Sequence, residues 1–129
     1  KKYFMQINLQ GNLMSLKQPK VMGILNITDN SFYDGGRYQS AKAILKRTEQ
    51  MLNEGADIID IGACSTKPGV TYVDEQTEFL KIEETVSELR RTFGTISISI
   101  DTFRARVAKI GIEKGASLIN DVSAGFMDA

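Results

Sequence analysis

The chain has 129 residues, of which 42% are hydrophobic and 25% are charged, as is usual for one globular domain. Its 16 basic and 16 acidic residues balance, which argues against a nucleic-acid or anionic-membrane partner. No apolar run approaches a membrane span, and no apolar secretory segment opens the chain. The single cysteine, Cys64, fits a reducing cytoplasm, and the absence of histidine argues against the usual zinc sites and Ser-His or Cys-His pairs.

The chain begins with alternating polar and apolar residues over 5–9 and 13–16. The Gly11-Asn12 pair between these runs predicts a tight turn, so we expect an amino-terminal hairpin. A continuous apolar run over 21–25 is then typical of a buried strand.

Helices and strands alternate along the rest of the sequence. We expect Ser40 to cap the first helix and Gly55 to end it. Asp74 opens a second helix whose apolar residues recur in steps of three and four, and whose acids are expected to form a solvated face. The predicted elements are a helix after Ser40, a strand over 57–62, a helix over 74–93, a strand over 96–101, a helix over 103–114 and a strand over 117–120.

This order predicts an α/β fold with a parallel sheet, in which the loops after the strands build the functional site. The conspicuous polar residues fall at these strand ends: Asn26 ends the first strand, Asp101 the third and Asn120 the fourth. Two long loops, 27–39 and 63–73, leave the same edge of the sheet. We therefore expect a candidate site at this edge.

Side-chain alternation refines this prediction. In the 96–101 strand the isoleucines share one face and should meet the helices, while the two serines and Asp101 share the other. The same parity places Asn26 and Asn120 in a ring with Asp101 at one mouth of a barrel or cleft. Each residue alone is equally explained as a cap or turn residue.

Two further residues, Asp60 and Cys64, each have a structural explanation as an alternative to a role in the site. Asp60 is equally explained as a buried acid held by hydrogen bonds, and Cys64 as an inert loop thiol.

The chemistry of these groups favours a small polar heterocycle that carries phosphate. An Asp-Asn pair matches the adjacent donors and acceptors of a 2-amino-4-oxo ring, and Asn26 offers an oxygen to Mg²⁺. The Ser65-Thr66-Lys67 stretch offers hydroxyls and a cation to a phosphate.

At these residues the sequence resembles dihydropteroate synthase. MGILNITDNSFYDGG, GADIIDIGACSTKPG and ISIDTF…GASLINDVSAG are similar to its first three signatures, in order. The resemblance implies a TIM (β/α)8 barrel and a transferase of folate biosynthesis, the target of sulfonamides. Such an enzyme joins 7,8-dihydropterin pyrophosphate to p-aminobenzoate, with Mg²⁺ assisting the loss of pyrophosphate.

Carried over by position, the resemblance assigns Asp101 and Asn120 to the pterin pocket, Asn26 to the metal and pyrophosphate, and Thr66 to the pyrophosphate. It also implies that loops 27–39 and 63–73 close over the site. The loop residues implied in catalysis are Asp29, Asn30, Ser31 and Lys67.

The sequence departs from the family pattern inside both loops. Asp29-Asn30 replaces the usual Pro-Asp, Ala63-Cys64 replaces Gly-Glu, and Lys67 replaces Arg. Exchanging an Asp/Arg pair for Asn/Lys loses bidentate geometry, so the departures bear on loop closure rather than on pterin binding.

A TIM barrel takes about 250 residues, so we expect the first four units of a truncated barrel: a lead-in over 1–20 and a half barrel over 21–129. Alone it should be inactive, and its open sheet edges should make it a homodimer. The alternatives are the pterin-binding domain of a methyltransferase and a non-catalytic binding fragment.

Overall fold

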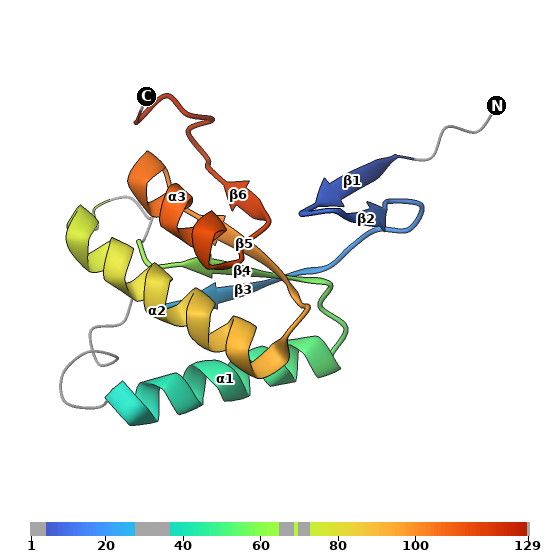
Figure 1. The fold of residues 1–129 in the computed structure, drawn as a ribbon, viewed down its shortest axis with the longest axis horizontal. Coiled ribbons are helices and arrows are strands. Elements are labelled where there is room, and N and C mark those ends of the chain that lie inside the picture. The colour runs from blue at the N-terminus through green and yellow to red at the C-terminus, as the bar shows by residue number, and fades with distance from the viewer. Residues whose placement is uncertain (1–4, 28–36, 65–68, 70–72, 129) are drawn as a thin grey trace.

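The structure is a computed structural model that describes residues 5–27, 37–64, 69 and 73–128, without the side chains of 37–40. The described residues form an antiparallel strand pair and a parallel sheet whose strand order is β3-β4-β5-β6 (Figure 1). The elements are β1 (Gln6–Leu9), β2 (Asn12–Ser15), β3 (Met22–Asn26), α1 (Arg37–Asn53), β4 (Ile58–Gly62), α2 (Glu75–Phe93), β5 (Ser97–Asp101), α3 (Ala105–Lys114) and β6 (Leu118–Asn120).

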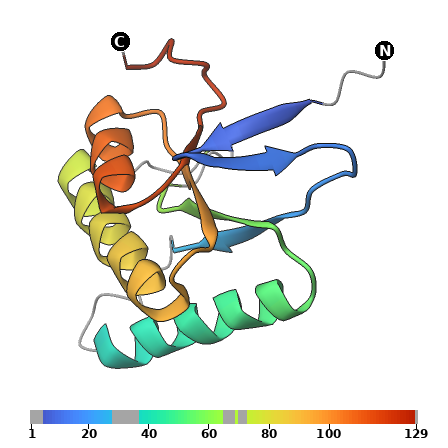
Figure 2. The same cartoon turned by 45° about the vertical axis from the view of Figure 1, so that its right-hand side comes forward.

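Each helix connects two neighbouring parallel strands, which is the βαβ arrangement that the sequence predicts. The three helices cover one face of the sheet, and the hairpin lies away from them (Figures 1 and 2). At the hairpin turn, Gln10 Nε2 donates to Ala116 O at 2.6 Å, just before β6 begins. The hairpin therefore meets the amino-terminal edge of the sheet and leaves the carboxyl ends of the strands to the candidate site.

The hydrophobic core lies between the helices and the isoleucine face of the sheet. Ile98 and Ile100 of β5 are fully buried, which confirms that the isoleucines meet the helices. Burying side chains of this size supplies about 1.5–3 kcal/mol each, so the alternation in β5 fixes which of its faces packs. The same cluster contains Leu25, Ile59, Ile61, Ile82, Val86, Leu89, Val107 and Ile110.

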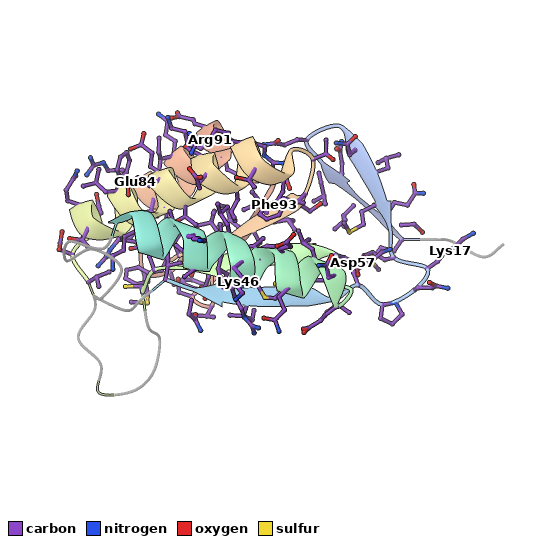
Figure 3. All side chains as sticks on the ribbon, turned by 90° about the horizontal axis from the view of Figure 1, so that it is seen from below. Lys17, Lys46, Asp57, Glu84, Arg91 and Phe93 are labelled. Carbon is purple, nitrogen blue, oxygen red and sulfur yellow. The ribbon has the colours of Figure 1, made fainter. Side chains whose placement is uncertain are left out.

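A single side chain joins three segments at the amino-terminal edge of the sheet. Arg90, in the last turn of α2, donates through Nη1 to Gly94 O and to Ile96 O, the latter at 2.8 Å. Its Nη2 donates to Gly115 O at 2.5 Å. At the start of β4, Asp57 Oδ2 accepts from Val21 N at 2.8 Å, close to the end of α1 (Figure 3). These contacts fix the short connections opposite the site.

The helix ends agree with the sequence at α2 and differ at α1 and α3. Asp74 caps α2 and accepts from Thr77 N at 2.9 Å, as expected. The prediction for Ser40 was wrong: α1 begins at Arg37, since Arg and Gln are good helix formers and draw Ser40 inside. The start expected at residue 103 was also wrong, because Arg104 is extended (φ −96°, ψ 120°) and α3 begins at the next residue, Ala105.

Several strand boundaries also differ from the prediction: β3, β4 and β5 begin at Met22, Ile58 and Ser97, each one residue later than expected. The hairpin turn consists of Gln10 and Gly11, both with positive φ (50° and 88°), so Asn12 already belongs to β2. The fourth parallel strand begins at Leu118 instead of residue 117. Among the described helices, none has both the length and the apolarity needed to cross a membrane.

Candidate functional site

The strand register places the predicted site residues in one row across the sheet. Asn26 pairs with Gly62, Gly62 with Asp101, and Asp101 with Asn120. Residues paired in this way on neighbouring parallel strands project to the same face. The structure therefore brings Asn26, Asp101 and Asn120 together at the carboxyl ends of the strands, on the face opposite the helices.

Gly62 is the member of this row that carries no side chain. A Cβ atom added to Gly62 would lie 3.6 Å from Asp101 Oδ2 and 3.7 Å from Asn26 Oδ1. Both oxygens thus converge on the position that a side chain would fill. Gly62 is therefore flanked by polar oxygens from β3 and β5.

A second polar layer lies one step below the row. Asp60 of β4 is paired in register with Ser99 of β5, and both are about 1% exposed. Asn120 Nδ2 reaches across β5 and donates to Asp60 Oδ2 at 3.2 Å. The other carboxylate oxygen of Asp60 and the hydroxyl of Ser99 have no hydrogen-bond partner among the described residues. Asp60 is therefore the buried, hydrogen-bonded acid that the sequence allowed, and its partner is a residue of the row.

Burial raises the pKa of Asp101, and the nearby carboxylates of Asp60, Glu78 and Asp121 raise it further. Asp121 has its own partners: its Oδ1 accepts from both the Ser123 hydroxyl and the Ser123 amide at 2.8 Å, and these bonds lower the pKa of Asp121. Asp101 is thus the carboxylate of the row that is driven towards its neutral form, and a ligand with N–H donors would favour the ionised form.

The turn that follows Asp101 is held by a buried acid on α2. Glu78, which is 0% exposed, accepts from Thr102 Oγ1 at 2.6 Å and from Arg104 Nη1 at 2.5 Å. Thr102 N also donates to Asn120 O at 3.1 Å. The segment that follows Asp101 is therefore tied to α2 and to β6, which limits where the Asp101 carboxylate lies.

A buried lysine lies at the base of the first loop. Lys81 of α2 is 1% exposed, and its Nζ lies 3.5 Å from Ile27 O. Ile27 N in turn donates to Gly62 O at 2.8 Å. Cys64, at the base of the second loop, is buried, and burial raises its pKa. A thiol with a raised pKa is a poor nucleophile, in line with an inert role.

The sequence analysis did not predict the structural roles of three residues, Glu78, Lys81 and Gly62. Glu78 was assigned to the solvated face of its helix, which was wrong, since it is fully buried. It lies four positions before the buried Ile82, so its place on the buried stripe was visible in the spacing. Nothing local marks Gly62, because its role depends on side chains from β3 and β5.

Five predicted site residues lie outside the described part of the chain. They are Asp29, Asn30, Ser31, Thr66 and Lys67.

The donor set suits a hard cation held by few protein ligands. Asn26 Oδ1 and Asp101 Oδ2 both lie within 3.7 Å of the position that a Gly62 Cβ would take, and oxygen donors are what Mg²⁺ prefers. Among the described residues, no three or more His, Cys, Asp or Glu side chains form a metal-holding group. Mg²⁺ usually keeps several waters and takes one or two protein oxygens plus substrate phosphates, so the residues present fit that ion.

Comparison with known proteins decides the family. The family model described as pterin binding enzyme matches residues 22–129. The chain belongs to this pterin-binding family. It is 41% identical over 113 residues to a dihydropteroate synthase of Staphylococcus haemolyticus, covering 88% of this chain and 42% of that protein. The chain thus spans less than half the length of this relative.

Solved structures of the pterin-binding family agree. The dihydropteroate synthase of Yersinia pestis in a sulfonamide complex is 38% identical with a TM-score of 0.83, covering 95% of this chain and 44% of that one. A Xanthomonas albilineans dihydropteroate synthase with 4-aminobenzoic acid is 35% identical with a TM-score of 0.82, covering 94% and 45%. Such neighbours are TIM barrels, which confirms the predicted fold class and makes this sheet part of a barrel.

Proposed function

We propose that this chain belongs to a dihydropteroate synthase that condenses 7,8-dihydropterin pyrophosphate with p-aminobenzoate. The observation that carries the proposal is the row of Asn26, Gly62, Asp101 and Asn120, with its polar groups converging at the carboxyl ends of the strands. The names of the relatives support the same reaction.

In this proposal Asp101 and Asn120 hold the pterin. An ionised Asp101 accepts hydrogen bonds from the guanidine-like edge of a 2-amino-4-oxo ring, and the Asn120 amide supplies a neighbouring polar contact. The ties from Glu78 to Thr102 and Arg104 hold the Asp101 segment in place before the ligand arrives. Such preorganisation reduces the entropy lost on binding.

The pyrophosphate end of the substrate is assigned to Asn26 and Thr66. Asn26 would hold Mg²⁺ through Oδ1, and the bound ion supplies positive charge that favours departure of pyrophosphate. Strands β3 and β4 end directly before the segments that contain Thr66 and the other loop residues. Those residues, Asp29, Asn30, Ser31 and Lys67, are proposed to exclude water and orient the amine.

The proposal is tested by pyrophosphate release in a full-length protein that carries this sequence. Release should require both the dihydropterin pyrophosphate and p-aminobenzoate, and a sulfonamide should inhibit it. Methyl transfer from a methylated pterin would instead assign the chain to the related methyltransferases. Pterin binding without either reaction would leave a non-catalytic binding protein.

We also propose that residues 1–129, expressed alone, form a homodimer without turnover. Ile24 on the edge strand β3 is 53% exposed, and Leu118 on the opposite edge strand β6 is only partly buried. Both lie on the face away from the helices, so the face and edge that the rest of a barrel would cover are open to self-pairing. Light scattering that shows a stable monomer would contradict this.

A cytoplasmic location completes the proposal. It is supported by Cys64, a buried cysteine without a disulfide partner in the described chain. Fluorescence imaging of the tagged full-length protein would test it.

A further inference from the structure

The orientation of the Asn120 amide is determined by what Asp60 is able to accept. The Asn120 atom that faces Asp60 is the donor Nδ2, and the carboxylate oxygen of Asp60 accepts from it. The structure shows this bond, from Asn120 Nδ2 to Asp60 Oδ2 at 3.2 Å. The remaining polar atom of the amide, Oδ1, is therefore directed away from Asp60.

The two residues meet although one strand separates them. Asp60 is on β4 and Asn120 on β6, with β5 between them in the sheet. Asp60 pairs in register with Ser99, whereas Asn120 pairs with Asp101. The Asn120 side chain thus connects the row that contains Asp101 to the layer that contains Asp60. Its Nδ2 points to the lower layer, and its Oδ1 stays in the upper row.

Asp60 is well placed to hold this orientation and badly placed to touch a ligand itself. It is 1% exposed, whereas Asp101 and Asn120 are both partly exposed. Its second oxygen has no partner in the described chain, so no competing donor draws the carboxylate away from Asn120.

We propose that Asp60 is a positioning residue, which fixes the amide of Asn120 so that Oδ1 stands beside Asp101 as a second acceptor for the donor-bearing edge of the ligand. The inference rests on the proposed function, because it takes the ligand to be a pterin. The two acceptors together select a ring that presents at least two N–H donors on one edge, which a 2-amino-4-oxo ring does.

The test replaces Asp60 by asparagine in the full-length protein. An asparagine side chain at this position both donates and accepts, so the amide of Asn120 is free to turn. We expect Asp60→Asn to weaken dihydropterin pyrophosphate binding about tenfold, the size of one well-placed hydrogen bond. The KM for p-aminobenzoate should stay unchanged. Ser99→Ala is the matched control, because Ser99 lies at the same depth without a hydrogen bond to Asn120, and its affinity should equal that of the unmodified protein.

A ligand comparison in the unmodified protein keeps the test decisive if Asp60→Asn does not fold. A pterin analogue without the 2-amino group presents fewer N–H donors on the edge that meets the two acceptors. It should therefore bind about tenfold more weakly than the pterin, the size of one well-placed hydrogen bond. Equal affinity of the analogue would contradict the presence of a second acceptor beside Asp101.

The outcomes separate this inference from the proposed function. If the unmodified protein does not bind the pterin, the proposed function fails. If it does bind, and folded Asp60→Asn binds equally well, only the positioning role of Asp60 is overturned.

Discussion

Glu78 accepts a hydrogen bond from Thr102 Oγ1 at 2.6 Å, and this contact joins a fully buried acid of α2 to the residue that follows Asp101. The second oxygen of Glu78 accepts from Arg104 Nη1 at 2.5 Å, and the Arg104 side chain is 15% exposed. One helix thereby holds the turn that leaves the candidate site. Helix α2, which packs on the outer face of the sheet, therefore also helps to fix the position of Asp101 on the opposite face of the sheet.

Glu78→Ala should destabilise the protein by about 3 kcal/mol or more, since it leaves the Arg104 charge buried without its partner. Arg104→Ala should also be destabilising, because it leaves the fully buried charge of Glu78 with only the neutral Thr102 hydroxyl as partner. Urea unfolding of both single variants and the double variant gives the coupling energy of the pair. Strictly additive effects would show that the contact contributes nothing.

Gly62→Ala should weaken pterin pyrophosphate binding while leaving stability nearly unchanged. The added methyl group would meet Asp101 Oδ2 and Asn26 Oδ1 at ordinary contact distances of 3.6 and 3.7 Å, so the fold tolerates it. It would nevertheless add bulk between these two oxygens, on the face where the ligand is proposed to bind. Titration calorimetry and thermal melting measure the two effects. Unchanged affinity would mean that the ligand does not approach the Gly62 backbone.

The stability of the protein should depend on pH through Asp101. Its pKa in the folded state is raised above the ordinary value of 3.8, so the folded state favours the protonated form. The stability that it contributes is complete below pH 3.8 and is lost as pH rises through the raised pKa.

Unfolding is therefore to be measured from about pH 4 to about pH 8 in the unmodified protein and in Asp101→Asn. The variant has no carboxyl group at this position, so its stability relative to the unmodified protein should increase as pH rises. A difference that is independent of pH throughout would show that Asp101 has an ordinary pKa. Pterin affinity, which needs the ionised acceptor, should change in the opposite sense and fall as pH is lowered.

Gly111→Ala should destabilise the contact between α3 and β5. A Cβ at Gly111 would lie 2.7 Å from Ile100 Cγ1, which is too close for a well-packed core. Overpacking of this kind costs about 1–3 kcal/mol, and the better helix propensity of alanine offsets up to about 1 kcal/mol.

Gly23→Ala is the comparison for this clash. A Cβ at Gly23 would lie 2.9 Å from Met51 Sδ, which belongs to a flexible side chain. We therefore expect Gly23→Ala to lose less stability than Gly111→Ala. Chemical denaturation of both variants checks the order of the two effects, and a greater loss in Gly23→Ala would contradict it.

Much of the fold was predictable because each strand and helix carries its own period. Alternation in β5 identified the buried face, since Ile98 and Ile100 pack while Ser99 and Asp101 turn inwards. Boundaries were less predictable where a tertiary contact decides them. The start of α3 is delayed because Thr102 and Arg104 are bound to Glu78, and nothing in the local sequence reveals that partner.

The row of Asn26, Asp101 and Asn120 followed from the rule that parallel strands end at one edge. The bond from Asn120 to Asp60 did not, because it crosses an intervening strand. Side-chain alternation places both residues on one face of the sheet, but it does not show that the Asn120 side chain is able to contact Asp60. Glu78 and Lys81 were hidden for another reason: their charge suggested exposure although their spacing placed them on the buried stripe.

The most direct test of the account is calorimetric titration of the full-length protein with 7,8-dihydropterin pyrophosphate. Asp101→Asn should weaken binding at least tenfold, since charge-assisted bonds to a carboxylate contribute about 1.5–3 kcal/mol. Asp57→Asn is the matched control at the opposite end of the sheet, and it should bind as tightly as the unmodified protein. Equal affinity of the Asp101→Asn variant would contradict the assignment of the pterin site.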